Sequence, residues 1–283
     1  MISSPRTWVD GADADRIPVD DRGLNYADGA FETLACTEGQ IHCAALHEDG
    51  LAKALTALCF ADPARQAAKV FGDIQRCLDE VRHTGTARLT VTRGSGPRGY
   101  APPSAAQARS VLSAHPPSAV AFSPLRCGVA ETHWADQPQL AGLKLLARTE
   151  QVLAAHEAAT HGWDDALMLD KERQVISSSK GNLFLFKGAD VTTPCLNRCG
   201  IAGTRRQVLI GNLLPQMGYS VSSRPVLLSE CLEADALIVT NTVMGVTAIE
   251  SIAEETFSGA RGVALARRLQ SALSEHIAAC DAQ

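Results

Sequence analysis

The chain contains 283 residues, of which 46% are hydrophobic and 20% are charged, a composition typical of globular proteins with one large domain or two of moderate size. It excludes fibrous, collagen-like and intrinsically disordered proteins. The formal net charge is -5 and no long run of Lys or Arg is present, so the basic surface of a nucleic-acid-binding protein is missing. We therefore expect a small anionic or neutral molecule as the ligand.

The N-terminal segment 1–16 has no apolar core of signal-peptide length. Elsewhere no apolar run approaches the roughly 18 to 20 residues that are needed to span a bilayer. The sequence therefore predicts a cytoplasmic protein that acts without a membrane partner.

Nine cysteines are present, and an odd number in a chain without a secretion signal predicts reduced thiols packed as small apolar groups. Cys195 and Cys199 form a C-x3-C pair, but no second pair of Cys or His lies at zinc-finger spacing. A structural zinc ion needs four such ligands, so we expect no metal site.

Apolar residues at strand and helix periods, separated by turn residues, predict the elements of the first part of the chain. The expected strands are residues 7–10, 29–37, 40–44, 89–93 and 110–114, and the expected helices are residues 47–59 and 64–82. Glu38-Gly39, between the second and third strands, is a hairpin signal. Val70, Ile74, Leu78 and Val81 recur at helical spacing and predict the buried face of the second helix.

Pro116-Pro117-Ser118 is the clearest boundary, because Pro cannot continue a strand ladder. It separates a small N-terminal domain, residues 1–115, from a larger C-terminal domain, residues 116–283. In the second domain the expected helices are residues 148–160, 204–217 and 263–279, and the expected strands are residues 166–170, 175–179, 183–187 and 236–240. Strands and helices that mix without strict βαβ alternation predict an α+β fold in both domains.

Five segments carry a more specific signal: Asp21–Thr33, Thr92–Tyr100, Ala141–Ala154, Gly181–Gln207 and Ala234–Val246. In order and spacing they resemble the fold-type IV pyridoxal-phosphate enzymes, which include branched-chain and D-amino-acid aminotransferases and 4-amino-4-deoxychorismate lyase. The sequences RGSGPRGY and KLLARTEQVL make the resemblance to the lyase the strongest. The resemblance implies a two-domain fold like that of D-amino-acid aminotransferase, with pyridoxal 5'-phosphate between the domains, and a homodimer.

Lys144 is the expected catalytic residue. In the family the lysine of this segment forms a Schiff base with the cofactor aldehyde and then moves protons, which requires an amine that can lose its charge. Taken without its neighbours, Lys144 is also compatible with a solvated lysine before a helix. Gly142, Arg148 and Gln151 stand in register with the family motif and favour the catalytic role.

Two further segments match the family's contacts to the cofactor phosphate. Gly203 and Thr204 open a helix whose first N–H groups suit an anion. Asn241 and Thr242 follow a strand and match the second phosphate-contacting loop. Each segment is weak evidence by itself, since Gly before a helix is common, and their joint placement carries the prediction.

Arg93, Arg98 and Tyr100 lie on the glycine-rich loop of the first domain and are the expected substrate-binding residues. Guanidinium groups bind carboxylates with two hydrogen bonds, which suits a small dicarboxylate such as aminodeoxychorismate. The sequence Gly-Pro-Arg-Gly is equally typical of an exposed turn, so this alternative stays open.

Three positions depart from the family pattern. Gly50 stands where the family has its main phosphate arginine, Ser177 stands where a glutamate pairs with the pyridine nitrogen, and Ala147 replaces an asparagine. Loss of the arginine costs roughly 1.5 to 3 kcal/mol of cofactor binding, unless another cation replaces it. Arg205, in the first turn of the phosphate helix, is the candidate replacement, and the alternative is an arginine that points to solvent.

The departures bear on the reaction. Without the glutamate the pyridine nitrogen is expected to be unprotonated, which weakens the ring as an electron sink. Elimination from aminodeoxychorismate is driven by aromatisation and tolerates this loss better than transamination does. The sequence thus favours a lyase that forms 4-aminobenzoate and pyruvate for folate biosynthesis. An aminotransferase for D-amino or branched-chain amino acids is one alternative, and a degenerate relative that does not use the cofactor is another.

The resemblance to dimeric enzymes also implies a subunit interface. Leu34 and Ile41 are apolar residues of the first hairpin, and we expect them to serve that contact.

Overall fold

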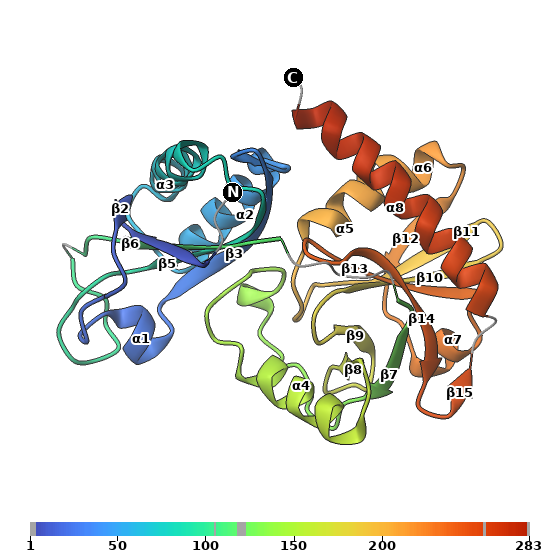
Figure 1. Cartoon of the computed structure of the whole chain (residues 1–283). Coiled ribbons are helices and arrows are strands. Elements are labelled where there is room, and N and C mark those ends of the chain that lie inside the picture. The colour runs from blue at the N-terminus through green and yellow to red at the C-terminus, as the bar shows by residue number, and fades with distance from the viewer. Residues whose placement is uncertain (1–3, 105, 118–122, 257–258, 282–283) are drawn as a thin grey trace. The chain divides into compact units, whose positions relative to one another are not determined.

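The computed structural model describes residues 4–104, 106–117, 123–256 and 259–281. The chain divides into two compact units (Figure 1). Unit 1 comprises Met1–Ala119, Leu143–Ala147 and Cys280–Gln283, and unit 2 comprises Val120–Gly142 and Arg148–Ala279. The first unit thus extends a few residues past the boundary expected after residue 115, and Ser118 of that boundary lies outside the described residues. Unit 1 also includes the short segment that carries Lys144.

Unit 1 is built on a six-stranded antiparallel sheet in the order β2-β1-β6-β5-β3-β4. Its strands are β1 (Arg6–Val9), β2 (Ala12–Asp13), β3 (Gly29–Thr37), β4 (Gln40–Ile41), β5 (Gly85–Thr92) and β6 (Arg109–His115). The hairpin at Glu38-Gly39 forms as expected, with both residues at positive φ. β4 is shorter than the expected strand 40–44, because Cys43 at φ 55° turns the chain into the next helix.

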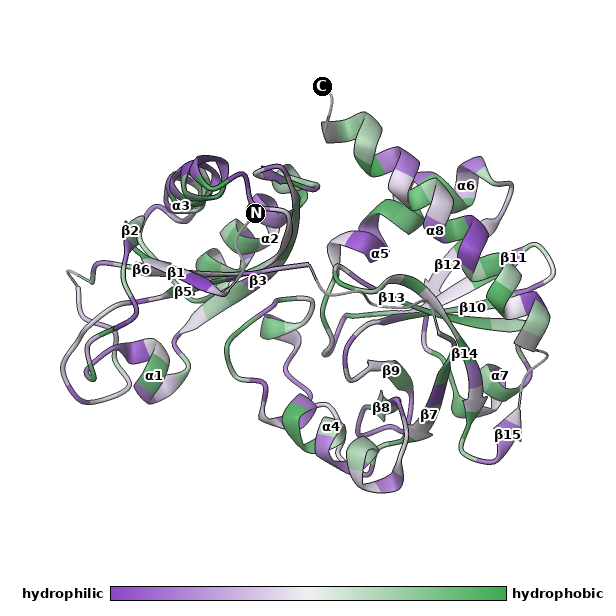
Figure 2. Ribbon diagram, in the orientation of Figure 1, coloured by the Kyte–Doolittle hydropathy of each residue, from purple (hydrophilic) through white to green (hydrophobic). Residues whose placement is uncertain are grey.

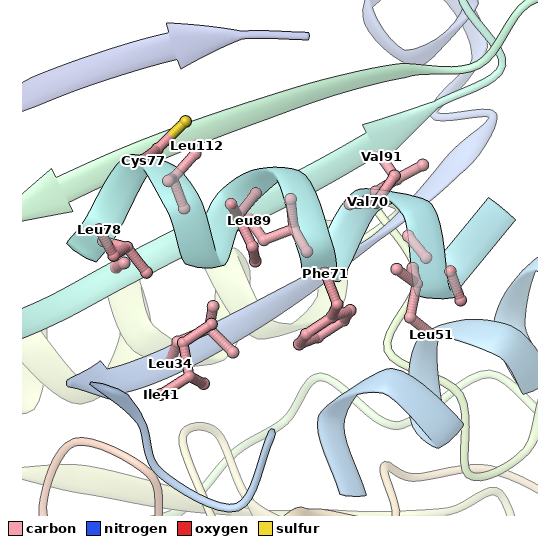
Figure 3. Close-up of a cluster of buried hydrophobic side chains, with 14 of the residues drawn as sticks. Leu34, Ile41, Leu51, Val70, Phe71, Cys77, Leu78, Leu89, Val91 and Leu112 are labelled. Atoms are coloured by element: carbon pink, nitrogen blue, oxygen red, sulfur yellow. The ribbon is translucent and has the colours of Figure 1, made fainter. Parts of the chain in front are cut away.

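The helices of unit 1 are α1 (Arg22–Tyr26), α2 (Ala44–Ala57) and α3 (Pro63–Glu80). α2 and α3 cover one face of the sheet (Figure 1). The expected stripe on α3 is confirmed for Val70, Ile74 and Leu78, which are buried, whereas the fourth expected member, Val81, lies just past the end of the helix and is half-buried. The three buried residues belong to one core cluster with Leu89 of β5 and Leu112 of β6, and Figure 3 labels Val70 and Leu78 beside these two leucines.

Leu34 and Ile41 do not serve a subunit contact. They are 0% and 1% exposed and belong to the core that α2 and α3 cover (Figure 3). Because their side chains point to the helix-covered face of the hairpin, the expectation of an apolar contact surface there is wrong. The homodimer stays a prediction that needs another surface.

Unit 2 contains a nine-stranded mixed sheet with the path β12-β11-β10-β13-β14-β7-β8-β9, to which β15 adds by pairing with β14. Its strands are β7 (Leu125–Val129), β8 (Asp165–Leu169), β9 (Val175–Ser178), β10 (Asn182–Lys187), β11 (Asp190–Pro194), β12 (Ser220–Arg224), β13 (Ala236–Asn241), β14 (Gly245–Ile252) and β15 (Glu255–Thr256). The sheet curls, so that the last strand, β9, contacts β10 and β11. The apolar side chains inside the curl form one core.

The helices of unit 2 are α4 (Thr149–His161), α5 (Thr204–Val208), α6 (Leu214–Gln216), α7 (Leu228–Leu232) and α8 (Gly259–Asp281), with a 3-10 turn at Pro138–Leu140. The helix expected at 204–217 runs from α5 to α6 through a π-helical turn at Leu209–Leu213. Pro215 explains this turn, because it lacks an N–H and its ring clashes with the carbonyl four residues earlier in a regular α-helix.

α8 is amphipathic, and its ribbon alternates between green and purple in Figure 2. Leu265, Ala266, Leu269 and Leu273 form its buried face. Within the described part of the chain, no helix is both long and apolar enough to cross a membrane.

Candidate active site

Lys144 is held against β3 within unit 1. Phe31 N donates a hydrogen bond to Lys144 O at 2.9 Å, and Leu146 N donates one to Gly29 O at 3.1 Å. The Lys144 Nζ atom lies 4.3 Å from the centroid of the Phe31 ring, a cation–π contact. Lys144 is half-buried, which differs from the alternative of a fully solvated lysine before a helix.

The two segments expected to contact the phosphate meet at Asn182 in unit 2. Asn182 begins β10 and pairs in register with Thr240 of β13, next to Asn241. Its side chain donates from Nδ2 to Ile201 O at 2.7 Å and accepts at Oδ1 from Gly203 N at 3.2 Å. Asn182 therefore fixes the start of α5 beside the end of β13, although Gly203 and Asn241 are 38 residues apart in the sequence.

Thr204 and Arg205 follow at the first turn of α5. Thr204 is 8% exposed, and its Oγ1 atom is buried without a hydrogen-bond partner among the described residues. Arg205 is 3% exposed, so the alternative of a solvent-facing arginine is wrong. Arg206 points elsewhere, because its Nη2 atom donates to Pro194 O and Ser223 Oγ, both at 3.1 Å.

The loop after β13 is shaped by Asn241. Its Oδ1 atom accepts hydrogen bonds from Val243 N at 2.9 Å and Met244 N at 2.7 Å, and its Nδ2 atom donates to Lys180 O at 3.2 Å. The Asn241 side chain is thus engaged in its own turn. Any contact of this loop to an anion would come from Thr242 or from backbone N–H groups.

Ser177 lies on β9 and is 4% exposed. The indole Nε1 of Trp134, from the loop after β7, donates a hydrogen bond to Ser177 Oγ at 3.0 Å. The Arg148 guanidinium carbon lies 5.4 Å from the centre of the Trp134 ring. Nε and Nη1 of Arg148 are buried without a partner among the described residues, and burial lowers the pKa of this arginine.

The three candidate residues on the glycine-rich loop of unit 1 have different environments. Arg93 is 6% exposed, donates from Nε to Asp28 Oδ2 at 2.8 Å, and stacks on Phe60. Arg98 and Tyr100 are exposed, Tyr100 to 88%. Arg93 thus has a structural partner, whereas Arg98 and Tyr100 are open to solvent.

Arg22 holds this loop in place. Its guanidinium is 2% exposed, donates to Asp28 Oδ2 at 2.8 Å, and reaches the carbonyls of Gly99 and Tyr100 at 2.9 and 2.8 Å. Burial alone would raise the pKa of Asp28, but the hydrogen bonds from Arg93 and Arg22 outweigh it, and the pKa lies below its ordinary value.

The chain matches one family of known proteins over most of its length. Residues 29–252 match the family described as amino-transferase class IV. The chain belongs to the class IV aminotransferase family. It is 31% identical to the aminodeoxychorismate lyase of Vibrio harveyi over 87% of this chain and 90% of that protein. It is 27% identical to a putative branched-chain-amino-acid aminotransferase of Methanocaldococcus jannaschii, over 87% and 85% of the two chains.

A solved structure gives the same result. The 4-amino-4-deoxychorismate lyase from Pseudomonas aeruginosa has a TM-score of 0.86 and 34% identity, covering 95% of this chain and 98% of that one. The expected fold, α+β with the fold-type IV architecture, is thereby confirmed, as is an enzyme similar to aminodeoxychorismate lyase. Class IV enzymes depend on pyridoxal phosphate.

Gly50, the position at which the family resemblance predicts an arginine, adjoins two buried polar residues of unit 1. Gly50 lies on α2, and a Cβ atom added to it would be 3.3 Å from Glu32 Oε1. Glu32 Oε2 is itself 2.7 Å from His47 Nδ1, and both residues are buried. Gly50 therefore lies beside a buried pair of an acid and a histidine, and a longer side chain at this position would meet Glu32.

Sequence reasoning missed two residues of this site. Asn182 is a polar residue directly before the apolar run LFLF, within the segment Gly181–Gln207 that resembles the family. A polar residue at the start of a buried strand is a sequence signal that could have marked it as a candidate. Trp134 gave none, because it lies in a polar loop 43 residues before Ser177, and only the folded chain brings the two together.

Proposed function

We propose that this chain is a pyridoxal 5'-phosphate-dependent lyase that converts 4-amino-4-deoxychorismate to 4-aminobenzoate and pyruvate. Similarity to two lyases over about nine-tenths of the chain supports the substrate class. The observation that carries the choice of a lyase is Ser177, a neutral hydroxyl bonded to Trp134 at the position of the family glutamate. A neutral partner suits an elimination driven by aromatisation.

The residues present fit the cofactor. The buried, unpartnered Thr204 Oγ1 and the first N–H groups of α5 are a set of donors that a phosphate would complete. Arg205, buried in the same turn, would supply the positive charge that Gly50 cannot. Thr242 and the backbone of its loop would contact the phosphate from β13, with Gly203 held in place by Asn182.

When bound, the cofactor supplies a ring that withdraws electrons from the carbon bearing the substrate amine. Lys144 Nζ would hold the cofactor in the resting protein, yield its place to the substrate amine, and then take the proton from that carbon. Arg98 and Tyr100 would bind the substrate carboxylates. The carbon–oxygen bond to the enolpyruvyl group then breaks, and protonation of the released enol gives pyruvate.

The test is a product assay on the purified protein with pyridoxal 5'-phosphate and 4-amino-4-deoxychorismate, without any 2-oxo acid. The proposal predicts equal amounts of 4-aminobenzoate and pyruvate. The similarity to a putative branched-chain aminotransferase favours transamination as the second candidate. Turnover that requires both an amino acid and a 2-oxo acid would replace the lyase with that activity. A protein that binds no cofactor would support the degenerate relative.

A further inference from the structure

The Trp134 side chain is fixed from three sides within unit 2. Its backbone N donates to Leu169 O at 2.8 Å, at the end of β8. Its ring is 6% exposed, packs in the core between α4 and β8, and carries the Arg148 guanidinium over it. The direction of its indole N–H, toward Ser177 Oγ at 3.0 Å, is therefore set by packing.

In this hydrogen bond Trp134 can only be the donor and Ser177 can only be the acceptor. An indole nitrogen is a donor only, so Ser177 Oγ must accept. The hydroxyl hydrogen of Ser177 then has to find an acceptor of its own. Among the residues that the structure describes, Ser177 has no side-chain hydrogen bond other than the one from Trp134. A buried hydroxyl keeps such a hydrogen unpaired only at a cost, which a ligand with a lone pair removes.

Other titratable groups near β9 do not provide that acceptor. On the elements packed against β9 and Trp134, and in the segments next to them, they are Arg148, Glu150, His156, Glu157, His161, Asp165, Asp170, Lys187, Asp190 and Cys199. Asp165 Oδ1 accepts from Ser179 Oγ and Ala166 N, and Asp165 Oδ2 is buried but has no hydrogen bond to Ser177 or to any other described residue. Asp170 Oδ1 accepts from the backbone N atoms of Glu172 and Gln174. Burial raises the pKa of Cys199 to about 12, so this thiol stays neutral.

We propose that Trp134 is a positioning residue that fixes the Ser177 hydroxyl as a hydrogen-bond donor, so that the site selects an aromatic nitrogen in its unprotonated form. The inference rests on the proposed function, which puts the pyridine nitrogen of the cofactor at Ser177. A protonated ring nitrogen would bring a second donor to an oxygen whose own hydrogen has no other partner. Trp134 thereby biases the chain against the protonated ring on which transamination depends.

The first experiment needs no cofactor. The chain has three tryptophans, so the indole region of a 15N-resolved NMR spectrum holds three signals. We expect Ser177→Ala to shift the Trp134 signal and to speed its hydrogen exchange, and to leave the other two in place. Unchanged exchange at Trp134 would overturn the hydrogen bond and the proposal. This readout also reports whether the variant is folded.

The second experiment measures the ring nitrogen directly, with ring-15N-labelled pyridoxal 5'-phosphate bound to the protein and followed over pH. We expect an unprotonated nitrogen in the wild type and a protonated one in Ser177→Glu, which restores the family's acid. In Trp134→Phe the pH of ring protonation should rise by about one unit, the value of one hydrogen bond. Trp163→Phe is the matched control, because Trp163 borders the same core but stacks on His161.

The outcomes separate the two proposals. If labelled cofactor binds and its ring nitrogen is protonated in the wild type, the role of Trp134 is wrong and the lyase proposal stands. If Trp134→Phe and Trp163→Phe titrate alike, Trp134 has only a packing role, and the inference is overturned. If no cofactor binds at millimolar concentration, the proposed function itself is wrong, and the inference falls with it.

Discussion

Gly203 N donates a hydrogen bond to Asn182 Oδ1 at 3.2 Å, and a Cβ atom added to Gly203 would lie 2.4 Å from that same oxygen. The start of α5 therefore approaches β10 so closely that only glycine fits beside the asparagine. Because Asn182 also pairs with Thr240 of β13, this contact sets the spacing of both segments proposed to bind phosphate.

A double-mutant cycle tests this relationship. Gly203→Ala alone should weaken cofactor binding at least tenfold, because the methyl group displaces the helix start. Asn182→Ala alone should lower the free energy of unfolding by about 1 to 3 kcal/mol, because it leaves buried backbone groups unpaired. In the double variant the clash is gone, so the effect of Gly203→Ala should shrink. Additive losses in cofactor titrations would contradict the contact.

The proposed phosphate role of Arg205 has a natural control in its neighbour. Arg205→Ala should raise the dissociation constant of pyridoxal 5'-phosphate about tenfold or more, the value of one charge-assisted hydrogen bond. Arg206→Ala should leave that constant unchanged and instead lower the melting temperature, because Arg206 ties α5 to Pro194 and Ser223. Fluorescence titration and thermal unfolding measure the two effects. Equal affinities for wild type and Arg205→Ala would remove Arg205 from the site.

The sequence predicts those helices and strands that have a clear pattern of apolar residues within their own segment. β10 and β13 are continuous apolar runs, and the stripe on α3 follows from helical spacing. β12, with the sequence SVSSR, is polar and mostly exposed, and only its pairing with β11 makes it a strand. The same limit applies to the site. Lys144 lies in a recognisable segment, but the partners of Ser177 and Gly203 come from distant residues that only the fold brings near.

The lowered pKa of Asp28 predicts that unit 1 loses stability at acid pH. Its folded-state pKa is lowered, so its contribution to stability is full above the unfolded value of about 4 and is lost as pH falls through the lower, folded value. Asp28→Asn leaves Arg22 and Arg93 buried without their shared carboxylate, which should cost about 3 kcal/mol at neutral pH. Urea unfolding should show the gap between wild type and variant closing below about pH 4. A gap that stays constant down to pH 2 would refute this linkage.

The cysteines should react in an order set by burial. Burial raises the pKa of Cys36, Cys199 and Cys231 to about 12, so their thiols stay protonated and shielded. Cys59 and Cys280 are exposed. In native protein, iodoacetamide should label these two first, and mass spectrometry of the peptides reads the order. Early labelling of Cys199 would contradict its packed environment.

Lys144→Ala should abolish formation of 4-aminobenzoate while the protein stays folded, because replacing a half-buried lysine leaves the apolar core of unit 1 intact. Circular dichroism checks the fold, and the product assay checks the activity. Turnover by this variant would exclude the covalent role of the lysine and favour an activity without the cofactor.

The central claim, that this chain carries pyridoxal 5'-phosphate on Lys144, is tested most directly by borohydride reduction followed by peptide mass spectrometry. The purified, cofactor-loaded protein should lose its yellow colour, and one peptide, the one with Lys144, should carry the reduced cofactor. Lys171 and Lys180 serve as internal controls, since both lie on unit 2 and are used in contacts with Asp136 and Asp164 O. Modification of another lysine, or of none, would contradict the account.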